Sequence, residues 1–169
     1  ARIYPGVLVT VEKTQPGTPA DGNDLNPSTA KCASCAAAIG QEFDILVMGS
    51  SLDGIAAQAA AIDGAGSVIA IDSESLASPL AVNHAAEVVA MAEGYSHILG
   101  PSTTYGRDLM PRIAALLGVN QVSDIMTVEG NYRFKRPIYA GNAVVTVEAP
   151  APIHIAAVFG VSDGDGCVH

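Results

Sequence analysis

The sequence has 169 residues, of which 49% are apolar and only 5% aromatic, and its formal net charge at neutral pH is −9. This length predicts one domain, at residues 1–169, with a sizeable buried core. A nucleic-acid-binding protein needs a basic surface, and eight Lys and Arg against seventeen Asp and Glu do not supply one. The same acidic balance disfavours an anionic membrane surface as a partner.

The sequence also bears on the compartment. No apolar run approaches the roughly 20 residues that cross a bilayer, so membrane insertion is not expected. The first residues, Ala1 to Gly6, lack the apolar core of a signal peptide. Three cysteines do not make the framework of a small secreted domain. We therefore expect a reducing compartment, and a bacterial cytoplasm and a mitochondrial matrix fit this expectation equally.

In chain order, β-rich apolar runs alternate with alanine-rich helical segments. Strands are expected at 6–12, 42–49, 67–72 and 97–99, and helices at 28–39, 54–62 and 75–94. Residues 13–27 hold Pro, Gly, Asn and Asp and almost nothing apolar, which predicts a surface loop. The alternation of strand and helix predicts an α/β fold with a doubly wound, mainly parallel sheet.

The pattern changes after Gly118, where strand-like runs follow one another with no helix between them. These runs are 121–128, 132–139, 143–148 and 153–159. Gly-Asn pairs at 130–131 and 141–142 mark turns between them. We therefore expect strands in the last third, some of them antiparallel, that extend or flank the parallel sheet. The Gly- and Asp-rich tail at 160–169 is expected to be irregular.

A turn rich in hydroxyl groups links the fourth expected strand to the next helix. The helix begins near Thr104 and bends at Pro111, or it begins at Pro111 itself, and the sequence leaves both open. A unit of strand, turn and helix places backbone N–H groups at the carboxyl edge of a parallel sheet, where open α/β sheets bind ligands.

Two interpretations of this turn stay open. In the first, it cradles an anion through backbone N–H groups and hydroxyls. In the second, it caps the helix and contacts a partner chain. The residues concerned are Ser102, Thr103, Thr104, Gly106 and Arg107.

The cysteines offer a weaker candidate site. Cys32 and Cys35 form a C-x-x-C pair inside an alanine-rich helix, and Cys167 and His169 complete a possible zinc set. The pair lacks the aromatic or Pro neighbour of a redox motif and does not open its helix. Buried or idle thiols are therefore the favoured interpretation, and no metal is expected.

The remaining motifs point away from catalysis. Residues 49–54 follow a strand and open a helix but match neither G-x-G-x-x-G nor the P-loop, so a hydroxyl-capped helix start is expected. His84, His97 and His154 are scattered and fit no nucleophile or zinc motif. No catalytic residue is therefore expected.

Three basic residues lie close together in this acidic chain. Arg133, Lys135 and Arg136 make a local positive patch. A docking surface and a run of solvated charge are equally compatible with it.

Three segments of the second half resemble one family. They read STTYGRDLMPRIAALL at 102–117, QVSD at 121–124 and RPIYAGNA at 136–143. In this order and at this spacing they are similar to the N-terminal domain of the electron transfer flavoprotein alpha subunit. The resemblance extends over about 6–159, is strongest from 96 to 145, and makes the loop at 13–27 an insertion.

The resemblance implies a Rossmann-like fold of the adenine-nucleotide alpha-hydrolase type, acting as a scaffold without catalytic activity. It implies pairing with a beta subunit that holds AMP, and FAD bound in a second alpha-subunit domain outside this sequence. The complete pair would carry electrons from acyl-CoA dehydrogenases, as in fatty acid beta-oxidation, to a quinone oxidoreductase. No cofactor is then expected on this chain.

The alternative is a stand-alone adenine-nucleotide-binding domain of the universal-stress-protein type. It would hold phosphate at the turn from Ser102 to Arg107 and adenine at the end of the strand at 7–10. Those proteins usually carry a late glycine-rich phosphate motif, which is not found in this sequence.

Overall fold

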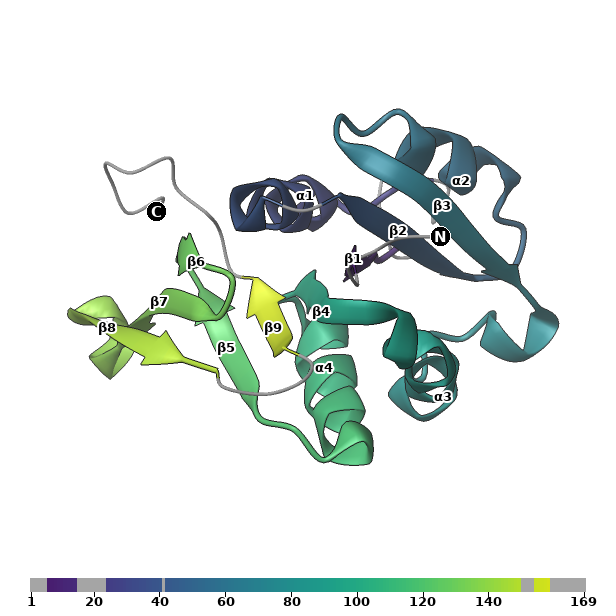
Figure 1. Ribbon diagram of the computed structural model, residues 1–169. Coiled ribbons are helices and arrows are strands. Elements are labelled where there is room, and N and C mark those ends of the chain that lie inside the picture. The colour runs from purple at the N-terminus through teal and green to yellow at the C-terminus, as the bar shows by residue number, and fades with distance from the viewer. Residues whose placement is uncertain (1–5, 15–23, 41, 150–153, 159–169) are drawn as a thin grey trace.

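A computed structural model of the protein describes residues 6–14, 24–40, 42–149 and 154–158 (Figure 1). The parallel sheet consists of β1 (Gly6–Thr10), β2 (Phe43–Gly49), β3 (Ala65–Asp72), β4 (Tyr95–Pro101), β5 (Gln121–Ile125) and β9 (His154–Val158). Its order is β3-β2-β1-β4-β9-β5, and every pairing is parallel. A second sheet, β6 (Thr127–Gly130), β7 (Arg133–Ile138) and β8 (Ala143–Glu148), is antiparallel. The expected α/β fold, with antiparallel strands in the last third, is confirmed.

Helices cover both faces of the parallel sheet. They are α1 (Ser28–Ile39), α2 (Asp53–Ala60), α3 (Ala81–Met91) and α4 (Thr104–Leu117). Side chains of α1 and α2 pack with Val7 and Val9 on one face, and those of α3 and α4 pack with Leu8 on the other. The antiparallel sheet belongs to the first layer, because Phe134 shares the core of α1. The result is a three-layer arrangement in which a small sheet takes the place of a helix.

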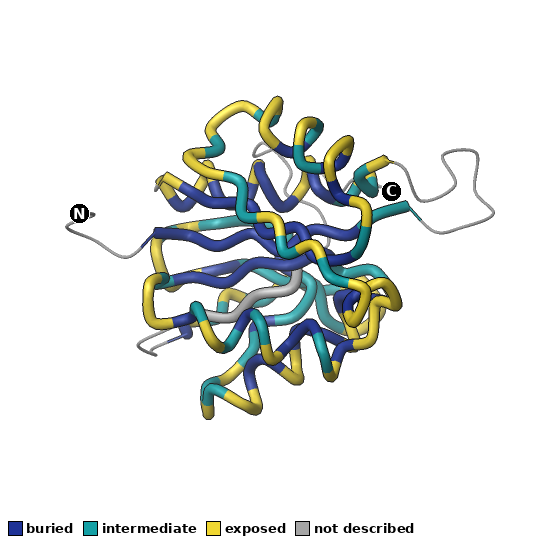
Figure 2. The backbone as a smooth tube through the Cα atoms, turned by 90° about the vertical axis from the view of Figure 1, so that its right-hand side faces the viewer, coloured by how far each residue is buried: buried dark blue, intermediate teal, exposed yellow. Residues whose placement is uncertain are grey.

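The central strands lie wholly inside the molecule. Every residue of β1 and β2 is buried, whereas the edge strand β3 alternates between exposed and intermediate positions. Figure 2 shows buried residues along the central strands and exposed ones on the outer turns of the helices. Burial on both faces explains why these strands read as continuous apolar runs rather than as alternating ones.

Helix α1 has the bounds that the sequence predicts. Pro27 occupies its N-cap position, and the amide oxygen of Asn26 accepts a hydrogen bond from the backbone N–H of Ser28 at 3.0 Å. Gly40 ends the helix in the left-handed conformation. These start and stop signals are local in sequence, which is why they could be read directly.

Two expected elements are wrong in extent. The expected helix at 75–94 is a 3-10 turn at Glu74–Leu76, then α3, then a 3-10 turn at Ala92–Gly94. The break falls where Pro79 disfavours helical backbone at the residue before it. The expected strand at 121–128 is two strands, because Asp124 takes a left-handed φ of 56° and the chain passes from the parallel sheet to the antiparallel one after Ile125.

The loop at 13–27 is described only at its two ends. Lys13 and Leu25 form an antiparallel bridge, and the N–H of Thr14 donates to the carbonyl of Asp24 at 2.8 Å. The side-chain amide of Gln58 in α2 holds the two ends of the loop in place. Its oxygen accepts from the Leu25 N–H at 3.0 Å, and its nitrogen donates to the Asp24 carboxylate at 2.9 Å. The rest of the predicted insertion, and the tail at 160–169, lie outside the described residues.

Candidate functional site

The hydroxyl-rich turn lies between β4 and α4, at the carboxyl edge of the parallel sheet. Helix α4 begins at Thr104 and contains Pro111, so the earlier of the two expected starts is the correct one. Thr103 is the N-cap, and its hydroxyl accepts a hydrogen bond from the backbone N–H of Gly106 at 3.2 Å. The expected unit of strand, turn and helix is therefore present, with a side-chain cap at the helix start.

Two carboxylates, one on each side, bond to the other side chains of the turn. The Ser102 hydroxyl donates to Asp124, which lies at the end of β5. The guanidinium of Arg107 donates to Ser102 at 3.3 Å and forms an ion pair with Asp124 at 3.6 Å. On the other side, the Thr103 hydroxyl donates to Glu12 at 2.7 Å. Sequence reasoning missed both Glu12 and Asp124.

These contacts favour the helix-capping interpretation over the anion cradle. The hydroxyl hydrogens of Ser102 and Thr103 point to carboxylates, so they do not face a free anion. Glu12 and Asp124 thus lie beside the two hydroxyls of the turn. Thr104 and Arg107 remain exposed and available to a partner chain.

The topological switch point of the sheet lies beside this turn. The chain runs outward through β1, β2 and β3 and then returns to β4 on the other side of β1, and such a point is where open α/β sheets hold ligands. Here the chain fills it. A Cβ on Gly100 would lie 2.4 Å from the sulfur of Met110 and 2.8 Å from the Thr10 hydroxyl. The Thr10 hydroxyl in turn donates to the Leu99 carbonyl at 3.1 Å.

The start of α2 corrects a sequence expectation. No hydroxyl side chain caps this helix. Instead, the Asp72 carboxylate at the end of β3 accepts from the N–H groups of Ser51 at 3.1 Å and Leu52 at 2.8 Å. An anion is already present at this helix start, supplied by the neighbouring strand.

Two of the histidines join elements of the fold. The ring of His84 contacts the Tyr105 hydroxyl at 2.7 Å and the Leu76 carbonyl at 3.3 Å, which links α3 to α4. The ring of His97 contacts the Ser96 hydroxyl and the Asn131 carbonyl, which links β4 to the turn between β6 and β7. Both rings are buried, and the structural interpretation of these two histidines is supported. His154 lies in β9, where side chains are not described.

The C-x-x-C pair lies on the inner side of α1. Cys32 and Cys35 are both free thiols with no exposed surface. Burial raises the pKa of both thiols, that of Cys35 to about 12, which is the opposite of what a reactive cysteine needs. Within the described ranges, no group of three His, Cys, Asp or Glu side chains is placed to hold a metal ion. Cys167 and His169 lie outside those ranges.

The three basic residues of β7 divide between its two faces. Arg133 pairs with Glu129 at 3.4 Å and with Glu148 at 4.0 Å, and Lys135 pairs with Glu129 at 2.7 Å. The hydrogen bond from Lys135 lowers the pKa of the Glu129 carboxyl. The alternation of a strand places Arg136 on the opposite face, so the three do not form one patch.

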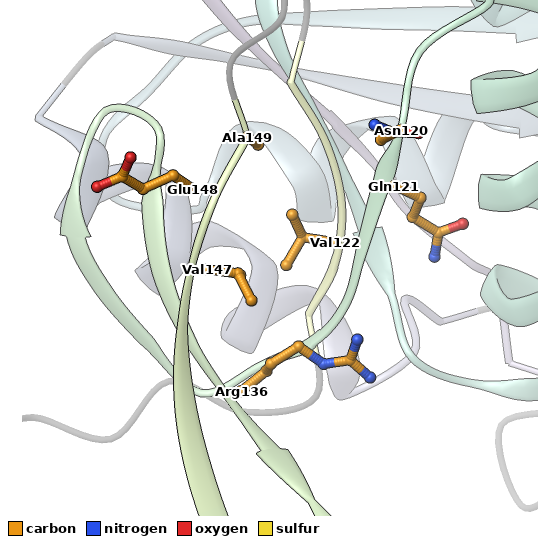
Figure 3. Close-up of a pocket in the computed structure, with 7 residues that line it drawn as sticks. All are labelled: Asn120, Gln121, Val122, Arg136, Val147, Glu148 and Ala149. Atoms are coloured by element: carbon orange, nitrogen blue, oxygen red, sulfur yellow. The ribbon is translucent and has the colours of Figure 1, made fainter.

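Arg136 lines a pocket of about 170 Å³ between β5 and the β7–β8 hairpin. The other lining residues are Asn120, Gln121, Val122, Val147, Glu148 and Ala149 (Figure 3). Sequence reasoning did not predict this pocket.

None of the helices in the described part of the chain has the length and apolarity to cross a bilayer.

The fold is a doubly wound α/β domain whose hydroxyl-rich turn is bonded to carboxylates of its own chain. A family model described as the electron transfer flavoprotein domain matches residues 18–160. The chain therefore belongs to the electron transfer flavoprotein domain family.

The curated relatives are alpha subunits of that family. The chain is 39% identical to the electron transfer flavoprotein subunit alpha of Pseudomonas aeruginosa over 134 residues, which cover 79% of this chain and 43% of the relative. It is 38% identical to the subunit from Paracoccus denitrificans over 72% of this chain and 39% of the relative. The chain is 37% identical to the mitochondrial alpha subunit of Arabidopsis thaliana, and the match covers 75% of this chain and 37% of the relative. The chain thus spans about two fifths of the length of these relatives.

Proposed function

We propose that this chain is the N-terminal scaffold domain of an electron transfer flavoprotein alpha subunit. It pairs with a beta subunit and with it supports a domain that holds FAD outside these residues. The complete pair holds AMP in the beta subunit. It carries electrons from acyl-CoA-type dehydrogenases to a quinone oxidoreductase, and this domain performs no catalytic step itself. A bacterial cytoplasm or a mitochondrial matrix is its expected location, since its relatives come from both.

The family match over residues 18–160 is the observation that carries this proposal. Close packing of Thr10 and Met110 against Gly100, near the carboxyl end of β4, also supports it. The neighbouring hydroxyl turn is bonded to the chain's own carboxylates. The same contacts remove support from the stand-alone nucleotide-binding alternative, which needs both places open.

The Arg136 pocket gives no support to a flavin site. Ligand pockets for molecules of drug size are generally about 300–1,000 Å³ and mostly apolar. The Arg136 pocket, at about 170 Å³, is too small for an isoalloxazine ring with its adenylate. This agrees with the proposal that the flavin is held in another domain.

Native purification of the 169-residue chain, alone and co-expressed with the beta subunit of the same genome, tests this function. We expect the chain alone to show no flavin absorbance and to release no nucleotide on denaturation. With the beta subunit we expect a one-to-one complex by native mass spectrometry. A tagged α/β domain of unrelated sequence is the control for non-specific capture.

Three outcomes would count against the proposal. Bound FAD on the chain alone would mean that this domain itself holds the flavin. Released AMP or ATP would support the stand-alone nucleotide binder and would direct attention back to Ser102 and Thr103. A chain that does not associate with the beta subunit would not be its scaffold partner.

A further inference from the structure

Strand β7 carries one cation for which the described part of the chain supplies no partner. The paired cations, Arg133 and Lys135, lie on the face where Glu148 is opposite Arg133 in the ladder. Arg136 lies on the other face, opposite Val145. Among the described residues, no acceptor bonds to the guanidinium of Arg136, and its Nε is buried without a partner.

Among the described residues this arrangement is unfavourable. A buried donor left without an acceptor loses its hydration without gaining a partner, and the cost is larger when the donor is charged. The chain has seventeen acidic residues and only eight Lys and Arg, yet none of the described carboxylates pairs with this guanidinium. The charge that would satisfy Arg136 is therefore one that this part of the chain does not supply.

The pocket beside Arg136 has room for such a group. Its volume of about 170 Å³ is several times the roughly 30 Å³ that one water molecule occupies, which accommodates a carboxylate side chain. Figure 3 shows the guanidinium extending beneath Val122, while the carboxylate of Glu148 points away from it. The apolar walls, Val122 and Val147, would strengthen a charge-assisted hydrogen bond made there.

The turn of the same hairpin presents an aromatic ring on strained backbone. Three successive residues have positive φ, with Tyr139 at 51°, Ala140 at 52° and Gly141 at 90°. The left-handed conformation costs free energy at every residue other than glycine, because the Cβ atom crowds the backbone. Tyr139 is nevertheless 79% exposed, so packing inside the chain does not compensate this cost. Strain of this kind is concentrated at binding surfaces.

We propose that the β7–β8 hairpin is a docking arm for a partner polypeptide, and that the Arg136 pocket receives an Asp or Glu side chain of that partner. Tyr139 packs against the same partner beside the pocket. A polypeptide fits better than a free small acid, because the exposed tyrosine and the small pocket lie on one hairpin and together need an extended surface. This inference rests on the proposed function, in which the partner is the beta subunit.

The test is the affinity of the chain for the beta subunit, measured by isothermal titration calorimetry with matched variants. R136Q removes the charge in the pocket, R136K keeps the charge without the planar fork, and R133Q removes a neighbouring cation on the opposite face. We expect R136Q to weaken binding roughly 10- to 100-fold, R136K to recover part of the loss, and R133Q to stay within about twofold. Y139A should weaken binding about tenfold.

A second measurement separates docking from folding. Because none of the described residues pairs with Arg136, R136Q should leave the melting temperature of the chain unchanged or raise it. A large fall in melting temperature would make Arg136 a structural residue and overturn the proposal. Equal affinities for R136Q and R133Q, with the wild-type chain binding normally, would overturn this inference alone. A wild-type chain that does not bind the beta subunit would overturn the proposed function, and the docking arm with it.

Discussion

His84 is held neutral by the groups around it. The Leu76 carbonyl can only accept, so Nε2 carries the proton and Nδ1 accepts from the Tyr105 hydroxyl. Burial lowers the pKa of His84, and the Leu76 hydrogen bond and the nearby Glu87 charge oppose this shift more weakly. A second proton on Nδ1 would reverse this bond, with the Tyr105 oxygen as acceptor, and would place a positive charge in a buried site.

We therefore expect the free energy of unfolding to fall in mild acid. The folded pKa of His84 lies below the unfolded value of about 6.5. The contribution of His84 to stability is therefore fully present above the unfolded pKa. It is lost as the pH falls from the unfolded pKa through the folded pKa, by up to about 1.4 kcal/mol for each pH unit. Urea unfolding of the wild-type chain at pH 7.5, 6.5 and 5.5 would measure this loss.

The variant H84Q provides the comparison, because it keeps a polar side chain but cannot titrate. All other titratable groups are present in both proteins, so their contributions cancel when the two curves are subtracted. The difference in unfolding free energy between wild type and H84Q should shrink as the pH falls. Parallel curves would show that His84 titrates at its ordinary pKa in the folded chain.

At the residue scale, the sequence identified the turn but not its partners. Ser102 and Thr103 were singled out because strand, turn and helix signals lie next to one another. Glu12 is 91 positions from Thr103, and Asp124 is 22 positions from Ser102. Only the order of the parallel strands brings these carboxylates to the turn. Single-sequence patterns do not fix that order, so an apparent anion cradle is in fact lined by anions.

Gly106 lets the first turn of α4 lie against the end of β4. A Cβ at this position would come within 1.7 Å of the Pro101 carbonyl oxygen, so the helix would have to move away from the strand. Because the obstacle is backbone, no side-chain rotation can relieve it. We expect G106A to lower the free energy of unfolding by about 3 kcal/mol or more, measured by chemical denaturation.

Gly54 in α2 is the matched control for this helix substitution. A Cβ there would meet no atom within 4 Å. The change G54A should therefore raise stability by about 0.5 kcal/mol, because alanine is the better helix former. If both variants lost stability to the same extent, the close approach of Gly106 to Pro101 would not be the cause.

At the element scale, local signals explain which bounds were predictable. Helix α1 matched because Asn26, Pro27 and Gly40 mark its ends in sequence. The helix expected at 75–94 was too long because the pattern of apolar residues runs past the break at Pro79. The strand expected at 121–128 hides a change of sheet, since apolar residues continue through the left-handed Asp124. Apolar periodicity reports burial, and here burial is continuous while the backbone is not.

At the scale of the molecule, the strand order was beyond the sequence. Strand β9 enters between β4 and β5, although it follows both in the chain and comes after the antiparallel sheet. Strand propensity is similar in each of the last runs, so it does not show which run joins the parallel sheet. The resemblance to the alpha-subunit family implied antiparallel strands that extend or flank the parallel sheet, but it did not supply the place of β9 in the strand order.

The two sheets share one core, and Phe134 is the residue that joins them most directly. Its side chain has no exposed surface and packs in the cluster that contains residues of α1 and of the parallel sheet. We expect the wild-type chain to unfold in a single transition, with circular dichroism and tyrosine fluorescence giving coincident curves. The change F134A should cost about 3–5 kcal/mol of unfolding free energy, because it leaves a cavity where the sheets meet.

Tyr139 offers the control on the same hairpin, since its ring is 79% exposed. Y139A should change the unfolding free energy by no more than about 0.5 kcal/mol, because exposed side chains contribute little to stability. A small effect of F134A, or separate transitions by the two probes, would mean that the antiparallel sheet folds independently of the parallel one. The hairpin would then be a separate unit, and its position over α1 would not be fixed by this core.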